Sequence, residues 1–364
     1  MHIHEAIKQA VDRISRLEEK KERLTKTIAK LRGKDLQVFG VKDIEETSLF
    51  QAVAPLELNQ KVGGVDSGFM GKNFHAVDVI LVRAMAAIFD YEKGALKQND
   101  FYPNFFKFPE PFILTDALEK DEFNCAKSLY RLKEEVGLAQ EVIEKFKPDF
   151  MYLDGSIIPQ HADKPRSSSR VLRVYHDILN TFQNLYATAE KNNCTLIGAV
   201  EDSRGTRFRG LLQQLMTKEK TFNPEQLDNF FDSTLLDSLL LPKERSLAFP
   251  YASRVEKHPI LNDFKKEWAE KIHVLYLKPS QFDFPLRVEF LSSGQLTEQA
   301  NKVASMTLAL SCLHKEYAYP SVLIEADLRA RLKPEEINLV FDKLADGTGK
   351  MSLGSLRRDK RPFN

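Results

Sequence analysis

Two short segments of the sequence end an apolar run with an aspartate that small residues follow. The first is Val65-Asp66-Ser67-Gly68 and the second is Leu153-Asp154-Gly155-Ser156. The runs before the aspartates are typical of buried strands. A strand that stops at such an aspartate places its carboxylate at the edge of a sheet, where glycine lets the backbone turn and lets another group approach. Two such carboxylates predict a cation site that handles phosphates.

An ordinary structural role also fits these two aspartates. Asp-Gly and Asp-Ser-Gly are common turn formers, in which the carboxylate accepts a hydrogen bond from its own backbone. Either motif alone is better explained in this way. Because Asp66 and Asp154 both follow almost fully apolar runs, the pair favours a functional interpretation.

A third acid comes from a strong amphipathic helix predicted over 121–147. At about 100° per residue its apolar side chains form one narrow stripe, and Glu135 lies roughly 65° from the middle of that stripe. A carboxylate at this border can reach over the sheet edge toward the two aspartates. The alternative is a boundary glutamate that pairs with Arg131 or Lys133.

A fourth acid lies near the C-terminus, where Pro320 suits the first turn of a helix and Asp327 sits two turns in. Taken alone, this segment is an ordinary amphipathic helix. Four neighbouring carboxylates would repel one another unless cations neutralise them. Oxygen-only ligands favour Mn²⁺ or Mg²⁺ over zinc, and two ions about 4 Å apart are the expected arrangement.

Basic and aromatic side chains that could hold an anionic polymer are expected in loops and helix starts beside the strand ends. Arginine binds phosphate through paired hydrogen bonds, and tyrosine can stack on an unpaired base. A solvated charged loop is the alternative for any one of them. The candidates for contacts with DNA are Lys72, Arg166, Arg170, Arg173, Arg204, Arg207, Tyr317 and Tyr319.

The elements that must position these residues follow an α/β pattern. Strands and helices are expected to alternate up to residue 200, as in a sheet with crossover helices. The first two strands are expected to form a hairpin across Gly68–Asn73. A mostly helical, polar insertion is expected over 205–270. The expected strands are 61–67, 74–90, 149–154, 194–200, 272–277 and 286–291, with helices at 121–147, 171–192, 295–314 and 320–332.

A long helix is also expected over 3–33, because apolar side chains recur there at spacings of three, four or seven. Packing on its own domain and dimerisation as a coiled coil fit this pattern equally well. The expected division of the chain is this helix over 1–35, a main domain over 36–335, and a C-terminal helix with a flexible tail over 336–364.

The composition is that of an ordinary soluble globular protein, with 43% hydrophobic and 29% charged residues among 364. The net charge of +1 shows no global basicity, so contacts with DNA must come from local patches. No apolar stretch is long enough for a membrane span, and the three scattered cysteines fit buried thiols in a reducing cytoplasm. Walker A, dinucleotide-binding, Gly-x-Ser-x-Gly and His-Glu-x-x-His motifs are missing.

The order of the motifs resembles that of the NurA-domain nucleases. The resemblance spans about residues 60–335 and includes the general character of the N-terminal helix. It is carried by strand-Asp66-Ser67-Gly68, helical Glu135-x-x-x-Ala139, strand-Leu153-Asp154-Gly155-Ser156 and Tyr319-Pro320-x-x-Leu323-x-x-Ala326-Asp327.

This resemblance implies an RNase H-like mixed sheet with flanking helices, here with a long N-terminal helix and a helical insertion. It implies a manganese-dependent nuclease that degrades DNA from its ends, of the 5′–3′ exonuclease type, and that also cuts single strands internally. It further implies a cytoplasmic homodimer that cooperates with a hexameric HerA-type ATPase in end resection at double-strand breaks. The family's metal-binding acids correspond to Asp66, Glu135, Asp154 and Asp327.

The chain departs from the family pattern at two positions. Asp327 stands where relatives often have histidine, which changes the charge of the site but still suits a hard cation. Glu201-Asp202 follows the third core strand, where relatives often have lysine, and Arg204 is the nearest base.

Two other functions remain open at this point. Sugar kinases and actin-like ATPases also use Asp-containing turns, and Asp66-Ser67-Gly68 with Lys72 fits their phosphate loop. No glycine-rich adenosine-binding segment follows late in the chain, however. The other alternative is a dimeric scaffold for a ring ATPase without catalysis, in which the carboxylates only form turns.

Overall fold

The computed structural model describes residues 3–74, 77–103, 107–219 and 223–347. The chain divides into two compact units, each built from three segments. The first unit comprises Met1–Leu56, Val200–Ser253 and Lys271–Tyr319, and the second comprises Glu57–Ala199, Arg254–Glu270 and Pro320–Asn364. From residue 348 on, the expected flexible tail lies outside the described residues. Among the described helices, none combines the length and apolar character needed to cross a membrane.

The second unit is built on a mixed sheet with the strand order β7-β6-β2-β3-β4. Strands β2, β3 and β4 pair antiparallel, whereas β6 and β7 run parallel to β2, and β5 adds to β3. β2 thus has one antiparallel neighbour, β3, and one parallel neighbour, β6, which confirms the expected mixed sheet. The strands are β2 Lys61–Asn73, β3 Asp78–Glu92, β4 Ala95–Tyr102, β5 Glu110–Leu114, β6 Phe150–Asp154 and β7 Thr195–Val200.

The first hairpin differs from the sequence expectation. β2 does not stop at Asp66 but continues to Asn73, and β3 pairs with it along its whole length. The hairpin between these two strands is confirmed, but its expected turn across Gly68–Asn73 was wrong, because those residues are themselves part of β2. Asp66, Ser67 and Gly68 stay extended because they pair with β3. Their side-chain positions alternate between the two faces of the sheet, as in any strand.

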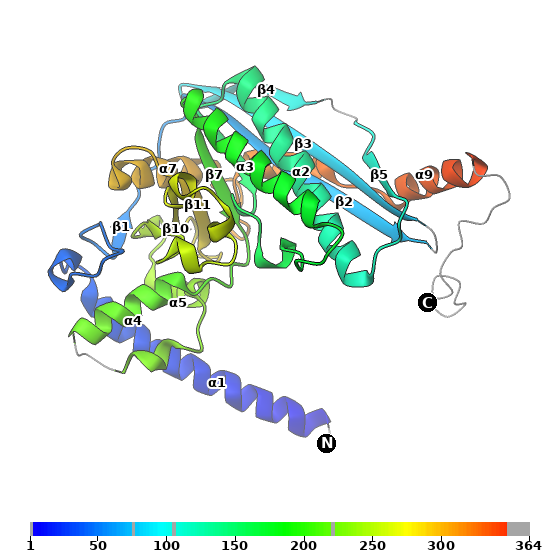
Figure 1. The fold of residues 1–364 in the computed structure, drawn as a ribbon. Helices are drawn as coiled ribbons and strands as arrows, with labels where there is room; N and C mark the ends of the chain where they lie inside the picture. Colours follow the sequence, from blue (N-terminus) through cyan, green and yellow to red (C-terminus); the bar gives the residue numbers. More distant parts are fainter. Residues whose placement is uncertain (1–2, 75–76, 104–106, 220–222, 348–364) are drawn as a thin grey trace. The chain divides into compact units, whose positions relative to one another are not determined.

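Helices cover both faces of this sheet. Helices α2 (Lys120–Phe146) and α3 (Leu172–Lys191) lie side by side (Figure 1), and α2 packs on β2 and β3. Helix α8 (Ser321–Ala330) packs on the same two strands, and helix α9 (Pro334–Gly347) packs on apolar side chains of β3.

Glycines in β2 bring α8 close to the strand. A Cβ on Gly64 would come within 2.8 Å of Val322, and one on Gly68 would collide with the carbonyl oxygen of Ala330. A Cβ on Gly63 would instead meet Met151 of β6 at 2.7 Å and Val142 of α2 at 3.5 Å, and α2 packs on β2. Since successive strand residues point to opposite faces, α2 and α8 sandwich β2. The glycine after Asp66 thus permits close helix packing rather than a turn.

The first unit has an antiparallel sheet with the order β1-β8-β10-β11, and β9 adds to β10. Its strands are β1 Phe50–Ala52, β8 Glu244–Ser246, β9 Phe249–Pro250, β10 Ile272–Lys278 and β11 Leu286–Leu291. Its helices are α1 Ile3–Ile28, α4 Arg207–Glu219, α5 Asp232–Leu239 and α7 Leu296–Leu310.

The expected insertion over 205–270 is not one helical body. Helices α4 and α5 share a hydrophobic core with the end of α1 in the first unit. The short strands β8 and β9 were not expected, because runs of two or three residues carry too little periodicity to be recognised. Residues 254–270, which include the short helix α6 (Lys266–Ala269), belong to the second unit, where Trp268 packs on Tyr186 of α3.

The long N-terminal helix is confirmed, and its two halves differ. Leu24 and Ile28 are buried in the core of the first unit. From Ile3 to Arg16 every side chain is exposed, including Ile7 at 55% and Ile14 at 59%. The helix therefore packs on its own unit at one end and presents apolar residues at the other.

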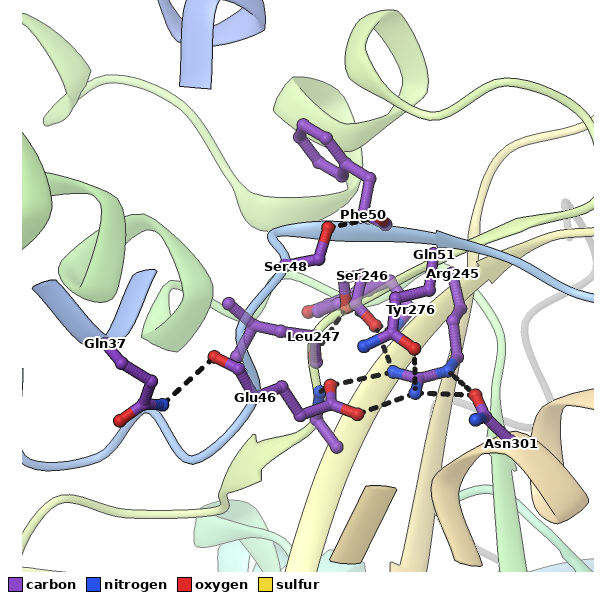
Figure 2. Close-up of polar contacts among 11 residues, drawn as sticks. Gln37, Glu46, Ser48, Phe50, Gln51, Arg245, Ser246, Leu247, Tyr276 and Asn301 are labelled. Atoms are coloured by element: carbon purple, nitrogen blue, oxygen red, sulfur yellow. Dashed lines mark hydrogen bonds and ion pairs between the residues drawn. The ribbon is translucent and has the colours of Figure 1, made fainter. Parts of the chain in front are cut away.

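A buried ion pair joins the N-terminal segment of the first unit to β8 (Figure 2). Arg245 donates from both terminal nitrogens to Glu46, at 2.8 and 2.6 Å, and neither side chain is exposed. Arg245 also donates to Gln51 and to Asn301 of α7, and the backbone N–H of Ala248 donates to Glu46. Each charge is thus fully hydrogen-bonded, which is the condition for tolerating it inside a protein.

We expect Glu46→Ala to lower the free energy of unfolding by about 3–5 kcal/mol, because it leaves the Arg245 guanidinium buried and unpaired. Replacing both partners, as Glu46→Leu with Arg245→Met, should recover much of this loss. Urea unfolding followed by circular dichroism measures both. Glu22→Ala, which breaks the exposed pair with Lys26, is the control and should leave the midpoint nearly unchanged. Equal midpoints for Glu46→Ala and Glu22→Ala would contradict this assignment.

Candidate metal centre

Asp66 and Asp154 come together because of the register between two parallel strands. Val65 of β2 pairs with Leu153 of β6, so the aspartates are the next residues on neighbouring strands. β6 ends there, since Gly155 adopts φ +100° and turns the chain out of the sheet. Glycine is needed at this position because other residues rarely adopt such a backbone. The Asp66 side chain is buried, and its carboxyl is hydrogen-bonded to that of Asp154.

Glu135 reaches the same place from α2. It is only 2% exposed, so it lies inside the helix–sheet interface rather than at the border expected from the helical wheel. The hydroxyl of Ser67, the residue after Asp66, donates to Glu135 Oε2. Arg131, one turn earlier on α2, donates to the same oxygen at 2.8 Å. The structure thus brings Asp66, Glu135 and Asp154 together from three elements.

The three carboxyls act on one another electrostatically. Burial, together with the charges of Asp154 and Glu135, raises the pKa of Asp66 to about 8. Burial also raises the pKa of Glu135 to about 7, although Arg131 and Ser67 oppose the rise. Burial is the largest cause of both shifts, and the guanidinium of Arg131 does not cancel it at Glu135. Carboxylates gathered in this way can be kept ionised by a cation.

The donor set suits a hard divalent cation. Its members are carboxyl oxygens, which favour Mn²⁺ or Mg²⁺ over softer metals. Within the described part of the chain, no three acidic, histidine or cysteine side chains are placed so that they could hold an ion together as they stand. Asp66, Glu135 and Asp154 are the candidates to hold such an ion, because their carboxyls interact with one another.

Arg131 is the nearest base to these acids. It faces the negative charges of Asp66, Glu135 and Asp154, and that of Asp163 as well. Its side chain is 23% exposed. A guanidinium in this position stabilises the ionised carboxyls in part, but a single positive charge does not balance the acids around it.

Asp327 lies on the part of α8 that passes near Asp66, but its carboxylate pairs with Arg331. Because α8 contacts β2 at Gly64 and at Gly68, the middle of the helix passes over Asp66 between them. Asp327 belongs to this middle turn. Its carboxylate, however, is 42% exposed and accepts two hydrogen bonds from Arg331, at 2.7 and 3.2 Å. Its place among the metal ligands stays a prediction.

Two of the basic residues expected to contact DNA already have partners in the second unit. Lys72 lies over the rings of Phe74 and Phe341, 5.6 and 5.0 Å from their centroids. Arg170 pairs with Glu122 of α2 at 3.1 Å. The charge of Arg170 is thus partly balanced by Glu122, and the side chain of Lys72 packs on two aromatic rings.

The other arginines are divided between the two units. Arg166 and Arg173 are exposed in the second unit, and Arg166 lines a pocket of about 460 Å³ at the start of α2. In the first unit Arg204 is exposed, whereas Arg207 pairs with Asp43. Their role in binding DNA stays a prediction.

The two tyrosines proposed for base stacking lie in the first unit. Tyr317 is 48% exposed and its hydroxyl donates to Glu201, while Tyr319 is buried and lies against it with ring centroids 5.6 Å apart. Tyr317 is thus the ring of this pair that has a face near solvent.

Sequence reasoning did not assign a role in the site to Ser67 or Arg131. A signal was available for both, since Ser67 follows Asp66 directly and Arg131 precedes Glu135 by one helical turn. The spacing of four residues predicts contact between Arg131 and Glu135, but it cannot show that Ser67 meets the same oxygen.

The raised pKa values predict that stability depends on pH when divalent cations are removed. The native state holds protons on Asp66 and Glu135 that the unfolded chain releases near its ordinary pKa values of 3.8 and 4.5. This contribution is complete below about pH 4 and is lost as the pH rises through about 7 to 8. We therefore expect the Tm in EDTA to fall between pH 5 and pH 8.5.

We expect Asp66→Asn to reduce this fall, because an amide carries no charge that burial and neighbours can penalise. At pH 8.5 in EDTA the variant should be more stable than the unmodified chain by more than about 1 kcal/mol. Calorimetric scans at both pH values measure the difference. Glu144→Gln, an exposed carboxyl on the same helix as Glu135, should behave like the unmodified chain. If the Tm of Asp66→Asn falls as much as that of the unmodified chain, ionisation of Asp66 does not destabilise the native state.

Comparison with known proteins gives a family for this chain. The family model of the NurA domain matches residues 60–332. The NurA nuclease from Sulfolobus solfataricus has the same fold, with a TM-score of 0.55 and 16% identity over 92% of this chain and 97% of that chain. A structure of NurA bound to dAMP and manganese is less similar, with a TM-score of 0.47, 12% identity, and coverage of 91% and 95% of the two chains. No protein with a curated description matches. On the family model, the chain belongs to the NurA domain family.

Proposed function

We propose that this protein is a divalent-metal-dependent DNA nuclease that uses Asp66, Glu135 and Asp154 to hold Mn²⁺ or Mg²⁺. The observation that carries the proposal is the convergence of these carboxyls at the end of β6, with the pKa of Asp66 raised to about 8. Membership of the NurA domain family supports it. Such metal sites activate water and stabilise the leaving oxygen in phosphodiester hydrolysis.

The individual acids would have different roles. Asp66 interacts with both other carboxyls, so it is the best candidate to bridge two ions. Glu135 and Asp154 would supply further oxygen ligands to these ions. Asp327 would join from α8 by exchanging its contact with Arg331 for the cation, and we expect two ions in all.

Basic side chains would hold the DNA backbone. Arg166 and Arg173 of the second unit are candidates, together with the partly engaged Lys72 and Arg170. In the first unit Arg204 and Arg207 would hold phosphates, and Tyr317 and Tyr319 would contact an unpaired base.

The ATP-binding alternative is less well supported than the nuclease. Phosphate loops need backbone N–H groups that turn toward the nucleotide. Here Asp66, Ser67 and Gly68 are paired with β3 in register with Met85, Ala84 and Arg83. Their backbone is committed to the sheet and forms no loop.

Membership of the NurA domain family also supports a proposal for the wider role. We propose a 5′–3′ exonuclease with single-strand endonuclease activity that works in the cytoplasm in DNA end resection and double-strand-break repair. A hexameric HerA-type ATPase would be its partner, and the working form would be a homodimer.

We expect Asp66→Asn and Asp154→Asn each to reduce Mn²⁺-dependent cleavage of linear DNA by at least about 10³-fold, because each removes an ionic ligand. Binding of DNA and the folded circular dichroism spectrum should persist. Duplexes labelled at either the 5′ or the 3′ end, incubated with Mn²⁺ or EDTA, measure activity and polarity together. Glu144→Gln serves as the matched control. Full activity in Asp66→Asn would refute the nuclease assignment, and a rise in Tm with ATP would favour the ATP-binding alternative.

We also expect the exposed half of α1 to mediate the homodimer. Ile7→Glu with Ile14→Glu should convert a dimer into a monomer, because it places charges on the apolar stripe. Light scattering after size-exclusion chromatography measures the mass. Arg13→Glu, a charged neighbour on the same exposed half, is the control. A dimer that survives the double substitution would place the interface elsewhere.

A further inference from the structure

The contacts of Glu135 are unequal between its two oxygens. Ser67 Oγ and Arg131 Nη1 both donate to Oε2. Among the described residues, Oε1 accepts no hydrogen bond. Oε1 is not among the fully buried side-chain atoms that lack a partner, so this oxygen lies where solvent or an ion can reach it.

The two donors come from different elements. Ser67 lies on β2, directly after Asp66, and Arg131 lies on α2 with Glu135 itself. One contact ties Glu135 to the strand that carries Asp66, and the other fixes its rotamer along the helix. Together they leave the side chain little freedom to rotate, because two donors at one oxygen define both its position and its direction.

We propose that Ser67 and Arg131 are positioning residues that clamp Oε2 of Glu135 and so present Oε1 as the single oxygen that binds the cation. This inference rests on the proposed metal-dependent function. Partners outside the ligand shell that orient a ligand typically change metal affinity by about 10–100-fold when they are removed. Here the clamp also explains why an arginine stands beside a cation site: its charge is directed at the oxygen that the ion does not use.

Binding of Mn²⁺ to the purified full chain, measured by electron paramagnetic resonance of the free ion, tests this directly. We expect Ser67→Ala and Arg131→Met each to weaken binding by about 10–100-fold, while Ser67→Thr, which keeps the hydroxyl, stays within a few-fold of the unmodified chain. Because both donors serve one oxygen, the double variant should lose less than the product of the two single effects.

The sign of the Arg131→Met effect is decisive. If the guanidinium only repelled the cation, its removal would tighten Mn²⁺ binding. Tighter or unchanged binding in Arg131→Met, or unchanged binding in Ser67→Ala, overturns the clamp. Arg329→Met breaks another ion pair between residues four apart on a helix, that with Glu325 of α8, and should leave Mn²⁺ affinity unchanged.

Asp66→Asn separates this inference from the function on which it rests. If Asp66→Asn binds Mn²⁺ as well as the unmodified chain, the metal site itself is wrong. If Asp66→Asn loses the ion while Ser67→Ala and Arg131→Met keep it, the site stands and only the clamp fails. Thermal scans in EDTA confirm that each variant is folded, and Arg131→Lys replaces Arg131→Met if the latter is not.

Discussion

Repulsion among buried carboxyls is the constraint on which the second unit depends. Asp66, Glu135 and Asp154 are separated by up to 88 residues of sequence, yet a strand register and a helix face bring them within interaction range. Burial makes the repulsion strong, since a low-dielectric environment screens charges poorly. The fold must supply enough packing energy around the site to hold the three together. Because the carboxyls repel one another, a cation bound among them would be stabilised.

That packing comes from the two helices that lie close to β2, one on each face of the strand. Gly64 and Gly68 remove side chains where α8 approaches, and the interior face takes α2. Close contact of helix and strand buries apolar surface efficiently and leaves few voids. It also fixes the position of each helix along the strand, which is why Glu135 of α2 meets the residue that follows Asp66. The first unit combines an apolar core with the fully hydrogen-bonded pair of Arg245 and Glu46.

The sequence was informative where local patterns decide the outcome. Apolar runs placed β2, β3, β6 and β7, and helical periodicity placed α1 and α2. The turn after Asp154 was predicted from its glycine. The continuation of β2 beyond Ser67 to Asn73 was not, because Asp-Ser-Gly is locally a turn sequence and only pairing with β3 makes it a strand. The shared oxygen of Ser67 and Arg131 was out of reach for a similar reason, since it depends on how a helix is seated on a sheet.

The N-terminal helix has one further consequence. Fourteen residues from Ile3 to Arg16 bury no side chain in this chain, and isolated helices of about 12–15 residues are marginal in water. Only continuity with the packed half around Leu24 and Ile28 supports these turns. In a lone molecule they should therefore fray from the free end, so that helix content grows with protein concentration as neighbouring molecules supply the missing contacts. Assembly and local folding would then be a single thermodynamic event.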